Sequence, residues 1–299
     1  MSVGAVRPAL AYAMLVLVML LWAAGVVVAR GVHELASPIA FSFWRWVTAL
    51  SLLTPLALRQ MRPHLEYIRA HARDFALLGL FMAGGSTLLV GSVQYTSATN
   101  AALVSATQPI VTVVVAWFLL HERLNRYQIL GVTSAMLGVL AMVMRMDIEA
   151  LIAFDVNPGD GLVLLAVVFY AFYSINLHRW ISALPALVTM YLTCAGGVMT
   201  LLPFYVVDTL VRAPIMIEPA LVAGVVFMAV VPTIVATTLW NMSVGAVGPS
   251  RASVFINLLP VFGTALAVVT LGEQLHGYHI VGGLLACTGI TLVVSGGRK

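Results

Sequence analysis

The sequence has 299 residues, of which 62% are hydrophobic and only 9% are charged. Soluble domains have about half apolar and about a quarter charged residues, so this composition excludes an ordinary soluble globular protein. The formal net charge is +4, but the arginines lie in short segments between apolar runs, and no basic face with interleaved aromatic residues is present, so a nucleic-acid partner is not expected.

Turn and charge clusters divide the chain into ten apolar segments, each close to the ~20 residues that cross a bilayer as a helix. Arg7 precedes a run that is too long for the core of a signal peptide, so we assign this run as the first span. The alternating pattern of a membrane barrel is absent. The sequence therefore predicts an all-α membrane protein with about ten transmembrane helices, near residues 10–30, 38–59, 74–94, 98–120, 125–145, 160–180, 185–208, 217–239, 249–271 and 277–296.

One change in composition divides the chain into halves. Acidic and turn-forming residues gather between Arg145 and Asp160, and we assign this stretch as the linker between residues 1–150 and 151–299. Each half then holds five spans, an odd number, so the second half must enter the membrane the opposite way round. This predicts two inverted five-helix repeats in one membrane domain, with the substrate site near the midplane between them.

A repeated block supports the duplication. Pro109 is followed after 13, 22 and 29 residues by Glu122, Gly131 and Gly138, and the same spacing joins Pro260 to Glu273, Gly282 and Gly289. The paired glycines lie two turns apart on one helix face, which allows close helix contact in lipid. Each glutamate follows a span. It can act at a gate or ion site, or it can anchor a turn by capping the next helix, and we favour the anchor.

Orientation follows from the basic residues. Arginine and lysine are concentrated in the loops on the side of the N-terminus, and the positive-inside rule then puts both termini in the cytoplasm. The residues on that side are Arg7, Arg59, Arg62, Arg69, Arg73, Arg123, Arg126, Arg179, Arg298 and Lys299, against Arg30, Arg145 and Arg212 on the other.

Arg45 is a candidate for contact with substrate. It lies seven residues past Pro38, which places it ~10 Å into the second span. A charge at that depth is costly unless it faces water or extends to the interface. Arg45 can therefore face a cavity and bind a substrate carboxylate, or it can extend to the outer interface beside Trp44 and Trp46.

Helical spacing places further polar and aromatic side chains on common faces within several spans. Any one of them can equally serve helix packing or interhelical hydrogen bonding. As a set they match the aromatic walls and few polar groups of a small-molecule cavity. The predicted substrate-binding residues are Trp22, Arg45, Ser86, Gln108, Phe169, Tyr173, Asn176, Thr237, Trp240 and Asn257.

The duplicated block and the ten-span layout resemble the drug/metabolite transporter superfamily, in the branch with two EamA-type repeats. The resemblance covers essentially the whole chain and implies inverted halves around a central cavity that opens to each side in turn. The overall likeness is greatest to bacterial inner-membrane aromatic amino-acid exporters, which implies a bacterial inner-membrane location. The small multidrug-resistance relatives use a glutamate in their first helix. This chain has Trp22 and no acid there, so the resemblance does not carry over their proton-coupled mechanism.

These observations predict a secondary transporter or facilitator that exports small amphipathic metabolites, most simply aromatic or hydrophobic amino acids, by alternating access. The expected partners are a small-molecule substrate and the lipid bilayer. No cofactor or metal is expected, since Cys194 and Cys287 lie inside apolar spans without metal-ligand spacing. The alternatives are export of other drugs or metabolites, and a membrane-embedded lipid-modifying enzyme, which would need acid, His or Cys groups clustered within the spans.

Overall fold

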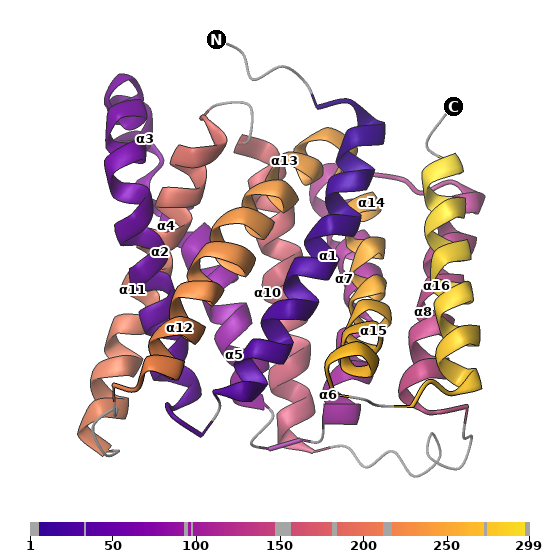
Figure 1. Cartoon of the computed structure of the whole chain (residues 1–299). Helices are drawn as coiled ribbons and strands as arrows, with labels where there is room; N and C mark the ends of the chain where they lie inside the picture. Colours follow the sequence, from indigo (N-terminus) through magenta and orange to yellow (C-terminus); the bar gives the residue numbers. More distant parts are fainter. Residues whose placement is uncertain are drawn as a thin grey trace.

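The computed structural model of the protein describes residues 6–32, 34–92, 95–96, 98–146, 157–180, 184–211, 217–271 and 274–296. Within these residues the regular secondary structure is entirely helical, as predicted. Figure 1 shows the helices standing side by side with both chain termini at the same end of the bundle. The elements are α1 (Pro8–Gly31), α2 (Pro38–Met61), η1 (Arg62–His64), α3 (Leu65–Ala70), α4 (Ala72–Gly79), η2 (Leu80–Gly84), α5 (Gly85–Ser92), α6 (Ala98–Ser105), α7 (Gln108–Leu120), α8 (Arg126–Val143), α10 (Pro158–Trp180), α11 (Ala186–Val211), α12 (Pro219–Met228), η3 (Ala229–Ala236), α13 (Thr237–Val247), α14 (Pro249–Ser253), η4 (Val254–Leu258), α15 (Leu259–Leu271) and α16 (Gly277–Gly296).

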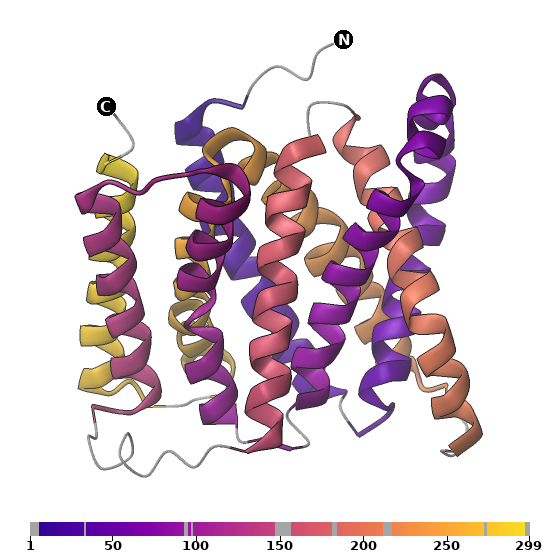
Figure 2. The same cartoon turned by 180° about the vertical axis from the view of Figure 1, so that it is seen from behind.

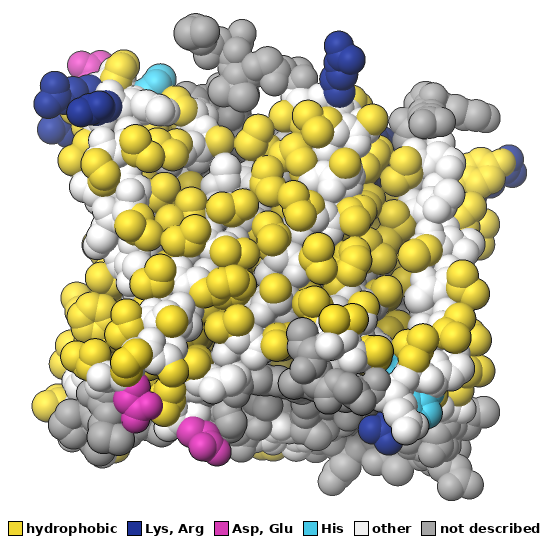
Figure 3. All heavy atoms as spheres, in the orientation of Figure 1, with side chains coloured by type: hydrophobic (Ala, Val, Ile, Leu, Met, Phe, Trp, Pro, Cys, Tyr) yellow, Lys and Arg dark blue, Asp and Glu magenta, His cyan; other side chains and the backbone are white. Residues whose placement is uncertain are grey.

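Nine helical stretches among the described residues are long and apolar enough to cross a bilayer. They correspond to nine of the ten predicted spans. The tenth, residues 249–271, is helical in three consecutive segments, α14, η4 and α15. Hydrophobic side chains cover most of the height of the face in Figure 3, and charged side chains lie near its edges. The chain therefore forms a multi-pass membrane bundle.

The helix starts have local causes. Proline occupies the first turn of α1, α2, α12 and α14, where its missing N–H removes no helical hydrogen bond. The Ser37 hydroxyl caps α2 by accepting from the Ala40 N–H. Asn125 and Gln128 form a reciprocal capping box at the start of α8.

The two halves interlock. The first helix of each half packs against the third and fourth spans of the other half, so α1 contacts α13 and α15 while α10 contacts α5 and α7. At one side of the bundle α2 packs along α11, and at the other side α8 packs along α16, as both views show (Figures 1 and 2). The predicted boundary between residues 150 and 151 lies outside the described residues.

Irregular turns recur at matching places in the halves. The third and eighth spans each contain a π-helical segment, η2 and η3. The fourth span is interrupted at Ala106–Thr107, just before Pro109, and the ninth passes through the 3₁₀ segment η4 just before Pro260. Such segments mark strain or functional sites within helices.

The repeated glycines form the contact between α8 and α16 that their spacing predicts. A Cβ atom on Gly138 would lie 2.5 Å from the Gly282 carbonyl oxygen, and one on Gly131 would lie 2.5 Å from the Gly289 carbonyl oxygen. These backbones therefore touch directly, which is possible only because neither helix has a side chain there.

Gly138→Ala should destabilise the protein, because the added methyl meets backbone atoms that have no side-chain freedom. We expect a loss on the order of 1–3 kcal/mol, the usual effect of overpacking a tight contact. The thermal midpoint of the purified protein in detergent measures this effect. Gly161→Ala is the matched control, since nothing lies within 4 Å of the added atom. Equal midpoints for the two variants would show that the glycine contact does not stabilise the bundle.

Candidate functional site

Arg45 lies inside the bundle and is only 9% exposed. Its Nη2 donates a hydrogen bond to the Ser86 hydroxyl at 3.0 Å, and that hydroxyl donates to the Ala83 carbonyl at 3.0 Å. The Nε atom of Arg45 is buried without a hydrogen-bond partner. The side chain therefore points from α2 toward α5 and does not extend to the outer interface.

The charge of Arg45 has no carboxylate partner among the described residues. Its neighbours are the Trp46 ring, whose centroid is 5.3 Å from the guanidinium carbon, and the Tyr170 and Cys194 side chains within electrostatic range. An unpaired buried cation is costly, and inside a membrane protein it is a candidate functional residue. Guanidinium binds carboxylate and phosphate groups with two parallel hydrogen bonds, so this position is chemically suited to an anion.

Tyr173 and Asn241 form a buried polar pair. The Tyr173 hydroxyl donates to Asn241 Oδ1 at 2.8 Å, and each side chain is 1% exposed. The amide nitrogen of Asn241 has no hydrogen-bond partner among the described residues. The pair joins α10 to α13, on the face of α10 that also carries Tyr170 beside Arg45.

Trp22, Trp240 and Thr237 converge on the π-helical segment η3. The Trp22 indole N–H donates to the Pro232 carbonyl at 3.2 Å, and the Thr237 hydroxyl donates to the same carbonyl at 3.1 Å. The Trp22 and Trp240 ring centroids are 5.3 Å apart. The sequence predicts these three residues in one site, and the structure brings Trp22 and Thr237 together at the Pro232 carbonyl, with Trp240 against Trp22.

Phe169 lies over the matching segment in the first half. Its ring approaches Gly84, where a Cβ atom would lie 2.9 Å from the ring, and it meets Phe81 edge-on with centroids 5.5 Å apart. Trp22 and Phe169, which occupy matching positions in the repeats, thus each contact the π-helical segment of the other half.

Phe169 also lines a cavity of about 490 Å³ between α2, α5, α10 and α11. The cavity lies toward the end of the bundle opposite the termini, because the first residues of α2 and the last residues of α11 border it (Figure 1). Its other lining residues are Pro38, Ile39, Leu80, Gly84, Thr87, Leu88, Gly91, Tyr95, Leu162, Leu165, Thr200, Leu201, Phe204 and Asp208. Arg45 does not line it, although Ser86, its hydrogen-bond partner, directly precedes Thr87.

The remaining predicted site residues stand apart from these groups. The Asn176 amide donates to the Phe172 carbonyl of its own helix at 2.8 Å. Gln108 is buried at the start of α7. Asn257 is buried in η4, and its amide nitrogen has no hydrogen-bond partner among the described residues.

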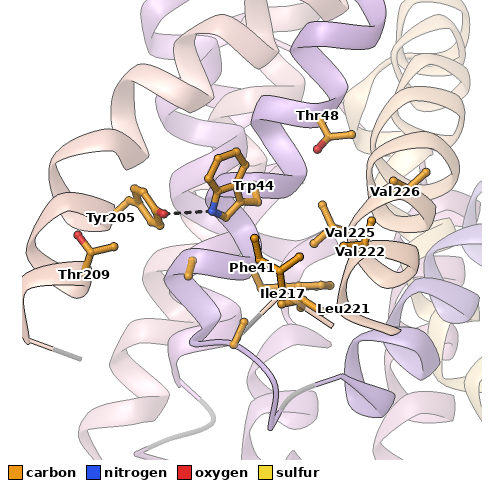
Figure 4. Close-up of a pocket in the computed structure, with 12 residues that line it drawn as sticks. Phe41, Trp44, Thr48, Tyr205, Thr209, Ile217, Leu221, Val222, Val225 and Val226 are labelled. Atoms are coloured by element: carbon orange, nitrogen blue, oxygen red, sulfur yellow. Dashed lines mark hydrogen bonds between the residues drawn. The ribbon is translucent and has the colours of Figure 1, made fainter. Parts of the chain in front are cut away.

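A second cavity of about 570 Å³ was not anticipated from the sequence. It lies between α2, α11 and α12, and apolar side chains form most of its wall (Figure 4). At its edge the Trp44 indole donates to the Tyr205 hydroxyl at 3.1 Å. None of the predicted site residues lines it. No local sequence pattern predicts this cavity, because it depends on the distance between α12 and α11.

Two further side chains near the site were missed. Tyr170 lies beside Arg45, but sequence analysis chose Tyr173 on the same helix. Asp208 is buried at the rim of the 490 Å³ cavity and accepts a hydrogen bond from the Ser37 hydroxyl. Tyr170 lies three residues before Tyr173 on the same helix, so its position could have been predicted from helical spacing. The contact of Asp208 with Ser37 could not, because it joins residues far apart in the chain.

Glu122 makes a different contact from the one expected. It does not cap α8, because Asn125 occupies that role. The Ser250 hydroxyl donates to Glu122 Oε2 at 2.5 Å, so Glu122 ties the first half to the start of α14 in the second half. Gly248, with φ of +86°, forms the adjoining turn, where a Cβ atom would lie 3.0 Å from Glu122 Oε1. Glu273 lies outside the described residues.

The bundle is that of a multi-pass membrane protein, and sequence comparison gives the family of transporters to which it belongs. The chain belongs to the EamA-like transporter family, which it matches twice, over residues 9–144 and 157–295. A crystal structure with 16% sequence identity superposes with a TM-score of 0.79 over 96% of each chain, which supports the fold alone.

Several relatives of the chain are described as transporters, pumps or exporters. The "Uncharacterized transporter YyaM" of Bacillus subtilis is 26% identical over 87% of this chain and 85% of its own length. The "Probable amino-acid metabolite efflux pump" of Salmonella typhimurium is 28% identical over 66% of this chain and 68% of its own. The "Probable terminal-alkyne amino-acid exporter" of Streptantibioticus cattleyicolor is 24% identical over 75% of each.

Glu122→Gln should lower the stability of the protein more than its ligand affinity. The change removes the charge from a hydrogen bond that joins the halves, and we expect a loss of about 1–3 kcal/mol. Thermal melting in detergent, with ligand binding measured in parallel, tests this prediction. Glu66→Gln is the matched control, since Glu66 is exposed and its side chain forms no hydrogen bond or ion pair with another described residue. A stable Glu122→Gln protein that no longer bound ligand would assign Glu122 to substrate handling instead.

Proposed function

We propose that the protein exports amino acids with apolar or aromatic side chains. The single observation that carries the proposal is Arg45, a buried cation without a carboxylate partner among the described residues. In this proposal the substrate carboxylate supplies the missing negative charge when it enters the bundle. The names of the relatives that export amino acids or their metabolites are consistent with this class.

The apolar part of the substrate would occupy the 490 Å³ cavity, which borders α2 and α5. This volume is within the range of small-molecule sites, and leucine and aromatic side chains make up most of the lining, while Thr87, Thr200 and the acidic Asp208 are among its polar residues. Phe169 offers an aromatic edge or face, and such ring contacts contribute roughly 0.5–1.5 kcal/mol beyond area burial. The carboxylate of Asp208 in this lining disfavours a strongly anionic cargo such as a sugar phosphate.

Alternating access would explain a difference between the two ends of the bundle: one end has a cavity, and the other is closed by hydrogen bonds. The 490 Å³ cavity lies toward the end away from the termini. At the terminal end, Glu122 holds Ser250, and the His178 ring lies 3.2 Å from the Val244 carbonyl. Both contacts hold the segment from α13 to α14. Release of these contacts would open the terminal end, and the matched irregular segments of the two halves are the places where the helices could bend.

Arg45→Gln should weaken phenylalanine binding by at least about tenfold, because a hydrogen bond to a charged group contributes about 1.5–3 kcal/mol. Phenethylamine, which lacks the carboxylate, should bind to the variant as it does to the unaltered protein. The thermal midpoint should stay the same or rise, since the change removes an unpaired buried charge. Equilibrium binding of the two ligands by purified protein measures the first two expectations, and thermal melting measures the third.

Arg126→Gln is the control for this experiment, because Arg126 is exposed at the start of α8. A stable Arg45→Gln protein with unchanged phenylalanine affinity would refute the carboxylate site. Liposomes that moved phosphorylated sugars faster than any hydrophobic amino acid would refute the substrate class.

We further propose that the protein lies in a bacterial inner membrane with both termini in the cytoplasm. The support is the concentration of arginines at the terminal end, where Arg59, Arg62, Arg69, Arg73 and Arg123 are all exposed. A fluorescent reporter that folds only in the cytoplasm should therefore be bright when fused after Lys299 and dark when inserted at Asn157, between the halves. Equal signals from the two fusions would contradict this orientation.

A further inference from the structure

The second span continues beyond the depth of the hydrocarbon. The helical stretch Pro38–Ala70 contains 33 residues, which at 1.5 Å per residue is ~50 Å long, against ~30 Å of hydrocarbon. Its last part is η1 and α3, and the chain then turns back into α4. Figure 1 shows this turn as the highest point of the bundle at the end that carries the termini. We call residues 59–73 the basic turn.

Four arginines of the basic turn are exposed and form no ion pair with another described residue. Figure 3 shows dark blue side chains of basic residues gathered at the upper left corner of the molecule, above the hydrophobic surface. Glu66 and Asp74 lie in or beside the same segment, but neither forms an ion pair with an arginine among the described residues. The four exposed arginines are Arg59, Arg62, Arg69 and Arg73.

The basic turn is held against the bundle. Tyr67 and Ile68 pack against the core cluster. The Tyr67 ring stacks on His71 with centroids 4.1 Å apart, and His71 Nδ1 lies 2.9 Å from the Tyr67 carbonyl. These contacts fix the position of the arginines just beyond the end of the span. Leu65, in the same turn, is 37% exposed.

We propose that the basic turn binds the headgroups of anionic phospholipids. The length of the second span places the basic turn at the depth of the lipid headgroups, where arginines are attracted to an anionic surface. Guanidinium groups match phosphate oxygens in two-pronged hydrogen bonds, and the exposed leucine can contact the first acyl carbons. This site is separate from Arg45 and does not depend on which substrate is transported.

The test compares two triple variants with equal change of charge. Arg62, Arg69 and Arg73 are replaced by glutamine in one, and Arg7, Arg123 and Arg126 in the other; all six are exposed at the terminal end. Each purified protein is titrated in detergent with dioleoylphosphatidylglycerol, and the retained lipid is counted by native mass spectrometry. We expect the first variant to bind at least about tenfold more weakly than the unaltered protein, and the second to bind nearly as well.

The controls separate the sources of the signal. Neutral dioleoylphosphatidylcholine should be retained equally by all three proteins, and inorganic phosphate at the same concentration should not displace the anionic lipid. Retention of phosphatidylglycerol by the first variant, or an equal loss in both variants, would overturn the proposal. Displacement by inorganic phosphate would assign the turn to free phosphate instead. If the triple variant aggregates, single Arg69→Gln and Arg69→Lys proteins must differ in retained lipid, and equal retention would again overturn it.

Discussion

Lipid offers no hydrogen-bond partner to the backbone, so each irregular turn in a span needs a partner from the protein itself. The π-helical segment η3 shows how this chain provides one. Pro232 has no N–H to give to the Met228 carbonyl, and the Thr233 hydroxyl donates to that carbonyl at 2.8 Å instead. The Pro232 carbonyl in turn accepts from Trp22 and Thr237. At Pro232 the irregular backbone is therefore buried and lies within reach of α1.

The same constraint gives Arg45 its importance. Most buried polar groups here are hydroxyls and amides satisfied within their own helix or by one neighbour. Arg45 is charged, and a single serine hydroxyl does not balance a cation in a medium of low dielectric constant. A fold selected for stability alone would have little reason to keep it. In the function proposed above, the carboxylate of the substrate offsets this cost.

Contact between the halves is backbone against backbone at both sides of the bundle. At α8 and α16 it is made through Gly131, Gly138, Gly282 and Gly289. At α4 and α11 a Cβ atom on Gly79 would lie 2.3 Å from the backbone of Gly196. Elsewhere the halves also meet through single hydrogen bonds, such as Trp22 to Pro232 and Glu122 to Ser250. The glycine contacts leave less room for movement than these hydrogen bonds do.

The sequence by itself determined the helical class, the approximate spans, the duplication and the glycine contact, because each follows from local hydropathy or from spacing along a single helix. Tertiary structure decided which helices became neighbours. Only then did Arg45 meet Ser86, Tyr173 meet Asn241, and Glu122 find Ser250, 128 residues away, instead of capping the adjacent helix. The cavities likewise belong to gaps between helices that are distant in the chain. A periodic pattern shows which face of a helix is polar, but the partner of that face depends on the packing of the whole bundle.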